Sequence, residues 1–357
     1  MSVIMIMETI KKLFAPVFWK VLLFSILLLV NGCKDNDDED DDEDLVGNWV
    51  ELSDFEGVPR TDAVVFTIGN KAYVGTGYDG EDRLNDFWEY DPQLNNWTRK
   101  ADFPGVPRNG AVGFGTDTKG YIGTGYDGVN KLNDFWEYDP VADKWTRVAD
   151  FAGTARYSAV SFSINNKCYV GTGYDGNSLK DFWEYDPSSN QWTQKVSLAG
   201  GKRRDAAAFV INGKGYILTG IDNGSYETDL LVYDPITNSW EKKRSIADVS
   251  DDDYDDDYGG IAGINKTAFS INGKGYLVTG GKGSAGTDVW EYDPQLDLWL
   301  QKTSLEASGR IEAVGFSIDN MGYITTGRNV STYFDDLWGF KPDAEQVDLD
   351  KALIVNP

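Results

Sequence analysis

Tryptophan recurs along this chain at nearly constant intervals. One series begins at Trp49, and five of the later tryptophans continue it in steps of 48, 48, 47, 48 and 59 residues. Each of the five lies seven residues after the tyrosine of a Tyr-Asp-Pro triplet; they are Trp97, Trp145, Trp192, Trp240 and Trp299. No triplet precedes Trp49, and no tryptophan follows the last unit, which contains Phe340 and Pro342. The chain therefore begins with the final segment of a repeat, and its last repeat lacks that segment. This arrangement predicts a closed ring in which the first segment completes the last repeat.

The first complete repeat, residues 58–100, contains four short apolar runs. We name the strands that they predict a, b, c and d, at residues 63–68, 71–77, 87–91 and 96–99. Typical turn residues separate a from b and c from d, so the strands are expected to be antiparallel. One sheet of four short strands is too small to be stable alone. Repeats of this length, rich in glycine and aromatic residues, are therefore expected to pack around an axis as propeller blades.

The units resemble Kelch repeats. The marks are small residues after strand b, then a spaced aromatic residue, Tyr-Asp-Pro and tryptophan. The small residues are Gly75–Gly77, Gly123–Gly125, Gly171–Gly173 and Gly280-Gly281, with only Thr219-Gly220 and Thr326-Gly327 in two repeats. The resemblance covers residues 47–342 and implies an all-β fold, a six-bladed β-propeller with four antiparallel strands per blade. The segment around Trp49 is then expected to complete blade 6 and close the ring. The propeller is assigned to residues 45–342, and a tail to 343–357.

Composition and motif context exclude several classes of site. The chain has no histidine, which excludes Ser-His catalysis, histidine-ligated metals and a copper site like that of galactose oxidase. Residues 75–80 match a dinucleotide-binding pattern, but a strand rather than a helix follows them, so no cofactor is expected. A net charge of −25 argues against nucleic acid as a partner. Cys168 lies in a predicted strand where other repeats carry glycine or alanine, and a small buried thiol is expected there.

The first 44 residues are interpreted as an export and anchoring segment. Lysines precede an apolar run at residues 21–30, which is too short for a membrane span of about 20 residues and typical of a secretory signal. The following Asn31-Gly32-Cys33 resembles a bacterial lipobox, which implies a signal peptide over residues 1–32 and lipid attachment to the membrane at Cys33. An uncleaved anchor is the alternative. Residues 33–44 then form an acidic tether.

Lys34 and the acidic residues after it also resemble an export signal of Gram-negative bacteria. The resemblance implies an outer-membrane lipoprotein that is exposed at the cell surface.

Antiparallel strand order brings the b–c loops and the d–a connections to the same end of the ring, which we call the b–c mouth. Five repeats carry an arginine six residues before a strand-a phenylalanine, and these side chains are expected at that mouth: Arg60, Arg108, Arg156, Arg203 and Arg310. Tyrosine follows strand b in three repeats and arginine in the sixth: Tyr78, Tyr126, Tyr174 and Arg328. All are candidates for binding hydroxyl and carboxylate groups of a ligand. The arginines could equally form structural pairs with aspartates of the ring.

The fifth repeat departs from the pattern. Gly263 occupies the arginine position, and the connection before it is about eleven residues longer than in other repeats. This insert carries an acidic run at residues 248–257 and is expected to overhang the b–c mouth. It could be a solvated loop, a lid or a calcium-binding loop, although it does not match the EF-hand pattern.

Two functions from different classes remain open. The first is a non-catalytic binding module that recognises a glycan or a protein at the b–c mouth, which agrees with the interaction role of many Kelch domains. The alternative is a carbohydrate-active enzyme that resembles a sialate mutarotase or epimerase, with Glu312 as the candidate acid-base group. The absence of histidine and the membrane anchor favour the binding module.

Overall fold

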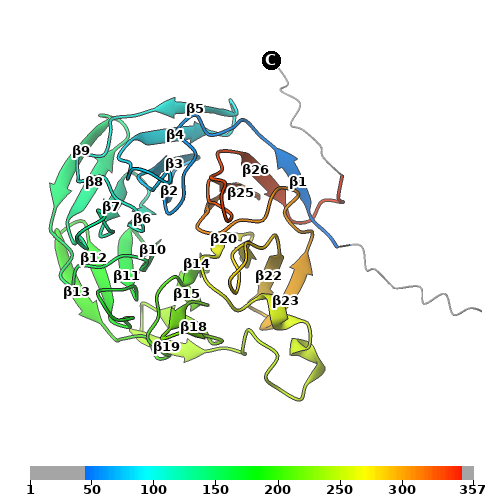
Figure 1. Cartoon of the computed structure of the whole chain (residues 1–357). Helices are drawn as coiled ribbons and strands as arrows, with labels where there is room; N and C mark the ends of the chain where they lie inside the picture. Colours follow the sequence, from blue (N-terminus) through cyan, green and yellow to red (C-terminus); the bar gives the residue numbers. More distant parts are fainter. Residues whose placement is uncertain (1–44, 348–357) are drawn as a thin grey trace, which may run out of the picture. The chain divides into compact units, whose positions relative to one another are not determined.

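The computed structural model describes residues 45–347. Their strands form six four-stranded antiparallel sheets, arranged as blades around one axis (Figure 1). The predicted six-bladed β-propeller is therefore confirmed. Within the described residues, no helix is long and apolar enough to cross a membrane.

Each blade runs from the axis outwards in the order a, b, c, d. Blades 1 to 3 consist of β2 (Val64–Ile68), β3 (Lys71–Gly75), β4 (Phe87–Asp91) and β5 (Asn96–Arg99); β6 (Val112–Gly115), β7 (Gly120–Gly123), β8 (Phe135–Asp139) and β9 (Lys144–Val148); β10 (Val160–Ile164), β11 (Lys167–Gly171), β12 (Phe182–Asp186) and β13 (Gln191–Lys195). Blades 4 and 5 consist of β14 (Ala207–Ile211), β15 (Lys214–Leu218), β18 (Leu230–Asp234) and β19 (Ser239–Lys242); β20 (Thr267–Ile271), β21 (Lys274–Val278), β22 (Val289–Asp293) and β23 (Leu298–Lys302). Blade 6 has β24 (Val314–Ile318), β25 (Met321–Thr325) and β26 (Leu337–Lys341), with β1 (Asn48–Glu51) as its outer strand; β16 (Ile221–Asp222) and β17 (Ser225–Tyr226) form a small hairpin in the b–c loop of blade 4.

The strands predicted for the first repeat agree closely with the structure. Strand b ends at Gly75 rather than Gly77 because the next two residues leave the extended conformation. Thr76 has φ of 57° and Gly77 has φ of 105°, so the chain turns left-handed immediately after the strand. The same turn recurs after strand b in every blade and directs the b–c loops away from the sheets.

The ring closes at the strand that contains Trp49, as the sequence predicts. β1 pairs with β26 in antiparallel register, with Trp49 opposite Phe340. The indole is fully buried, its ring lies 4.7 Å from that of Phe340, and its Nε1 donates a hydrogen bond to Thr303 O at 3.1 Å. The described start of the segment assigned to a tail also returns to this seam, because Gly47 N donates to Ala344 O at 3.0 Å.

Blades pack through strand-a phenylalanines that enter the neighbouring blade at a small residue. Phe66, for example, packs onto Gly120 of the next blade, where an added Cβ would clash with its ring. Cys168 occupies the same strand-b position in blade 3. Its side chain is completely buried and unpaired in a disulfide, as expected of a small packing residue.

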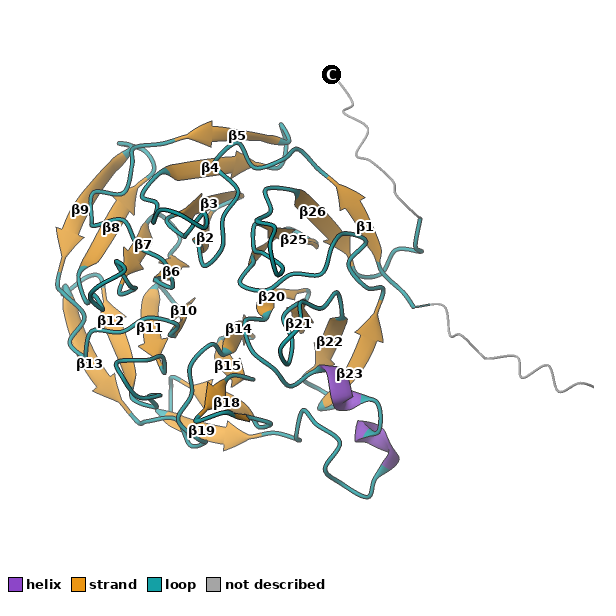
Figure 2. Ribbon diagram, in the orientation of Figure 1, coloured by secondary structure: helices purple, strands orange, loops and turns teal. Residues whose placement is uncertain are grey.

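The acidic insert does not lie over the b–c mouth, where antiparallel strand order predicts it. Its run forms two short 3₁₀ turns, η1 (Asp253–Asp255) and η2 (Tyr258–Gly260), outside the ring beside β22 and β23 (Figure 2). Tyr258 anchors it there by packing on Trp290 and accepting a hydrogen bond from Trp299 N at 2.7 Å. The expectation that it overhangs the b–c mouth is therefore wrong. The added length packs against the outer strands instead of folding over the axis.

Candidate functional site

The five repeated arginines are structural, and the expectation that they line the b–c mouth is wrong. Arg60 is fully buried, and its guanidinium makes a two-pronged contact with Asp86, at 2.5 and 2.7 Å. The same group donates to Thr76 O at 3.0 Å. Three others repeat this arrangement with an aspartate of their own blade: Arg108 with Asp134, Arg156 with Asp181 and Arg310 with Asp336. Arg203 makes a single bond of 2.6 Å to Asp229 and a longer contact of 3.5 Å with Glu227. A buried guanidinium requires such a partner.

The arginines also join neighbouring blades through their backbone. Gly77 N donates to Arg108 O of the next blade at 2.8 Å, and an equivalent bond of 2.7 to 2.9 Å occurs at each of the six blade boundaries. In blade 5 the acceptor is Gly263 O. Its missing side chain is replaced by Lys266, whose Nζ donates to Thr279 O at 2.9 Å. The structural alternative considered for the arginines is thus the correct one.

Two residues after each arginine position, the backbone enters the left-handed region. Six residues, one per blade, have φ between 50° and 60°: Asp62, Gly110, Ser158, Asp205, Asn265 and Glu312. The N–H of each donates to the carbonyl of its counterpart in the preceding blade at 2.9 to 3.2 Å, and the bond from Asp62 to Glu312 completes the circle. We call these six residues the axial ring. The circle of hydrogen bonds holds its members rigidly around the axis.

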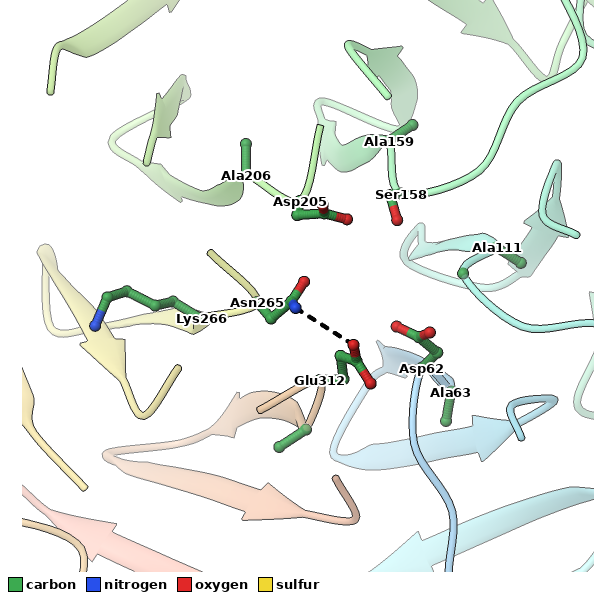
Figure 3. Close-up of a pocket in the computed structure, with 12 residues that line it drawn as sticks. Asp62, Ala63, Ala111, Ser158, Ala159, Asp205, Ala206, Asn265, Lys266 and Glu312 are labelled. Carbon is green, nitrogen blue, oxygen red and sulfur yellow. Dashed lines mark hydrogen bonds between the residues drawn. The ribbon is translucent and has the colours of Figure 1, made fainter. Parts of the chain in front are cut away.

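The axial ring lines a cavity of about 190 Å³ that opens at the b–c mouth (Figure 3). Its polar side chains surround the opening, whereas the next residue of each blade is alanine except for Lys266 in blade 5. Figure 3 shows the Lys266 side chain directed away from the cavity. The cavity therefore has a polar entrance formed by the axial ring, followed by a ring of alanine methyl groups. Three of the six entrance residues are carboxylates: Asp62, Asp205 and Glu312.

The three carboxylates differ in their neutralising partners. Glu312 accepts two hydrogen bonds from Arg328, at 2.8 and 3.2 Å. Asp205 accepts one from Arg204 at 2.6 Å. Asp62 has no cation bonded to it within residues 45–347, and its bond from Asn109 Nδ2 spans 3.1 Å. Burial, followed by the negative charge of Glu312, raises the pKa of Asp62 to about 8.

Tyrosines and basic side chains form a rim above the axial ring. The Arg83 guanidinium lies over the rings of Tyr78 and Tyr126, 5.2 and 5.0 Å from their centres. Tyr157 then contacts Tyr126 and Tyr174, with ring centres 5.4 and 5.6 Å apart. This chain of contacts continues to Tyr333 at one end and to Arg204 at the other. All three tyrosines of the predicted set and Arg328 lie at the mouth, in partly exposed positions.

Sequence reasoning missed the residues closest to the axis. Asp62, Asp205 and Asn265 do not form a repeated motif, because the residue at this position differs between blades. The usable signal was the polar or small residue two positions after each arginine. A left-handed conformation favours glycine, asparagine and aspartate, and four of the six ring members are of these types.

The Asp62 carboxyl should make stability depend on pH. The folded protein keeps the Asp62 proton up to about pH 8, whereas the unfolded chain releases it near 3.8. Because the folded state binds more protons in this window, the contribution of this group to the free energy of unfolding falls as pH rises from about 4 to 8. Asp62→Asn is expected to flatten that decline. Thermal unfolding from pH 4 to pH 9 measures it, and identical profiles for variant and wild type would contradict the assignment.

Comparisons with known proteins agree with this architecture. The Kelch motif matches residues 59–104, 125–152, 155–198 and 202–245. No curated protein matches the chain at a significant level. The solved structure of YjhT has a similar fold, with a TM-score of 0.66 and 19% sequence identity over 80% of this chain and 95% of that one. Since 868 chains of solved structures match in all, the fold by itself selects no ligand. The repeated motif and the six-bladed ring together show that the chain belongs to the Kelch-repeat β-propeller family.

Proposed function

We propose that the protein is a binding module that recognises a polyhydroxylated ligand, of the glycan class, at the b–c mouth. The observation that carries the proposal is the axial ring with its three carboxylates around an open cavity. Sugar hydroxyls donate hydrogen bonds to carboxylates and accept them from guanidinium and amide groups. Arg328, Arg204 and Asn265 supply such donors beside the carboxylates.

The tyrosine rim supports the same ligand class. The hydroxyls of Tyr78 and Tyr126 donate to Gly80 O and Gly128 O, each at 2.7 Å, so these rings are held in place before a ligand arrives. Fixed aromatic side chains lose little conformational entropy on binding. The fold does not require them, because blades 4 and 5 have Ile221 and Gly281 at the equivalent bridge position.

Tyr126→Ala is expected to weaken glycan binding at least tenfold while leaving the melting temperature nearly unchanged. The variant removes a rim side chain at a position where other blades do without it. A glycan array probed with the full chain identifies the ligand, and titration calorimetry compares variant and wild type.

Ile236→Ala is the matched control, since that side chain is exposed in a c–d turn at the opposite end of the ring. Equal affinity in Tyr126→Ala and wild type would exclude the rim from binding. Absence of any glycan ligand, with retention of a protein partner, would favour the protein-binding alternative.

A carbohydrate-active enzyme of the sialate mutarotase kind is a second candidate. It is favoured by one observation, the pairing of Asp62, whose pKa is raised to about 8, with the arginine-bonded Glu312. A carboxyl group with a raised pKa beside a second carboxyl group is a usual arrangement for general acid and base catalysis. NMR of sialic acid with the full chain measures exchange between its anomers. No acceleration over buffer would remove this candidate.

We also propose that the chain is a lipoprotein anchored at the outer surface of a Gram-negative cell. The lipobox-like Asn31-Gly32-Cys33 supports it, although this segment lies outside the described residues. Cys33→Ser is expected to prevent lipid attachment and release the protein from the membrane fraction. Metabolic labelling with a fatty acid, and protease treatment of intact cells, test lipidation and exposure separately. Unchanged membrane retention in the variant would support the uncleaved-anchor alternative.

A further inference from the structure

A second cavity lies at the opposite end of the ring, between blades 2 and 3. Its volume is about 570 Å³, within the range of small-molecule sites. Blade 2 contributes Thr116, Lys119 and Glu137, and blade 3 contributes Asn166, Lys167 and Asp186. This cavity is separate from the axial ring and shares none of its residues.

Blade 2 departs from the repeat where it borders this cavity. At the last position of strand a, the other five blades carry a buried isoleucine: Ile68, Ile164, Ile211, Ile271 and Ile318. Blade 2 has Thr116 there, and β6 ends one residue earlier, at Gly115. In blade 1 the isoleucine belongs to the apolar cluster that joins it to blade 2. The corresponding cluster between blades 2 and 3 has no such member.

The same blade leaves one strand-c carboxylate without a cation. In blades 1, 3 and 5 the equivalent glutamates, Glu89, Glu184 and Glu291, each accept a hydrogen bond from a strand-b tyrosine and pair with two lysines. Among the described residues, Glu137 of blade 2 keeps only the bond from Tyr121 OH, at 2.7 Å.

Both lysine partners of Glu137 are missing for identifiable reasons. Lys119, which follows the a–b turn, pairs with Asp139 at 2.6 Å instead. The second lysine is Lys100, Lys195 or Lys302 in the other blades, and its position in blade 2 is Val148. Within residues 45–347 Glu137 therefore forms no ion pair, although it lines the cavity. A half-buried carboxylate of this kind gains most from a cation supplied by a ligand.

We propose that this cavity binds a small organic molecule through a primary ammonium group seated on Glu137. Tyr121 bonds one carboxylate oxygen and leaves the other available. The lining contains three carboxylates, Asp117, Glu137 and Asp186, and two lysines. Both lysines already pair with aspartates, so the charge balance of the lining favours a cation. The Asn166 amide already bonds Asp117, and the Ser188 hydroxyl donates to Asp186. Each keeps further hydrogen-bonding capacity for polar groups on the rest of the molecule. An amino sugar and an aliphatic diamine both present the required group.

Titration calorimetry of the full chain with glucosamine and with 1,4-diaminobutane tests the proposal. At least one of the amines is expected to bind, and whichever binds identifies the source of the ammonium group. N-acetylglucosamine, which keeps the sugar but lacks the charge, is expected to bind at least tenfold more weakly than glucosamine. Failure of both amines to bind, or equal binding of the acetylated sugar, would overturn the proposal.

Glu137→Gln is expected to weaken amine binding at least tenfold. Glu89→Gln is the matched control in blade 1, where two lysines already neutralise the carboxylate, and it should leave amine affinity unchanged. Thr116→Ile restores the residue of the other five blades and is expected to abolish binding without lowering the melting temperature. Undiminished binding in Glu137→Gln would refute the role of this carboxylate. Tyr126→Ala should leave amine binding unchanged, which distinguishes this site from the b–c mouth.

Discussion

Deletion of Gly47 to Leu52 is expected to open the ring and to cause a large loss of stability. The segment contains β1, whose four residues pair along β26. It also carries Trp49, which is fully buried. Without β1, the edge of β26 would be exposed to solvent and to other chains. We therefore expect both a much lower melting temperature and aggregation on heating.

The point variant Trp49→Ala tests the same β1–β26 closure with a smaller perturbation. Truncation of a buried aromatic side chain costs about 3–5 kcal/mol, and here it also removes the hydrogen bond to Thr303 O. Trp240→Ala is the matched control, because Trp240 donates an equivalent bond to Val196 O but is only partly buried. Calorimetric or circular dichroism melting curves compare them. A deletion mutant that melts like the wild type would show that β1 does not close the ring.

Arg108→Ala is expected to destabilise the protein by about 3–5 kcal/mol, the usual result of leaving one half of a buried ion pair. Arg108 is completely buried, and Asp134 would lose both of its guanidinium contacts. Although burial raises the pKa of Asp134, Arg108 outweighs it and holds the pKa below its ordinary value. The variant should therefore also lose some of the protection that this pair provides as pH falls toward the acid range.

Arg147→Ala is the control for loss of an arginine as such. Arg147 pairs with Asp150 on an exposed surface, and removing such a pair costs at most about 1 kcal/mol. Urea unfolding measures both variants. A stable Arg108→Ala protein that no longer binds its ligand would reverse our conclusion and return the arginines to the binding site.

The axial ring shows why the repeated arginines are not the residues that line the b–c mouth. Arg60 and Asp62 are two residues apart, yet one is enclosed in its blade and the other lines the axial cavity. Their roles depend on the left-handed turn at Asp62, with φ of 50°. The residue types at this position favour a left-handed turn, but they do not show that the turn directs its side chain toward the axis. The repeat spacing therefore predicts correctly which connection reaches the b–c mouth. It does not predict that Asp62, rather than Arg60, lines the cavity there.

The acidic insert illustrates a similar limit. Strand parity correctly predicts at which end of the ring a connection leaves and enters. It does not predict whether extra residues fold toward the axis or away from it. Packing of Tyr258 against Trp290 decides that question, and such a contact is not encoded in the spacing of the repeats.

The sequence by itself determined the six-bladed ring, most strand boundaries of the first repeat and the closure at Trp49. These follow from periodic apolar residues, turn residues and small packing positions, which act over a few neighbours and recur in each repeat. Only the tertiary structure decided which polar side chains are enclosed and which face a cavity. That outcome depends on backbone handedness at single residues, such as Asp62, and on which side chains of adjacent blades meet, as at Thr116 and Glu137. Contacts of this kind arise only once the ring has closed.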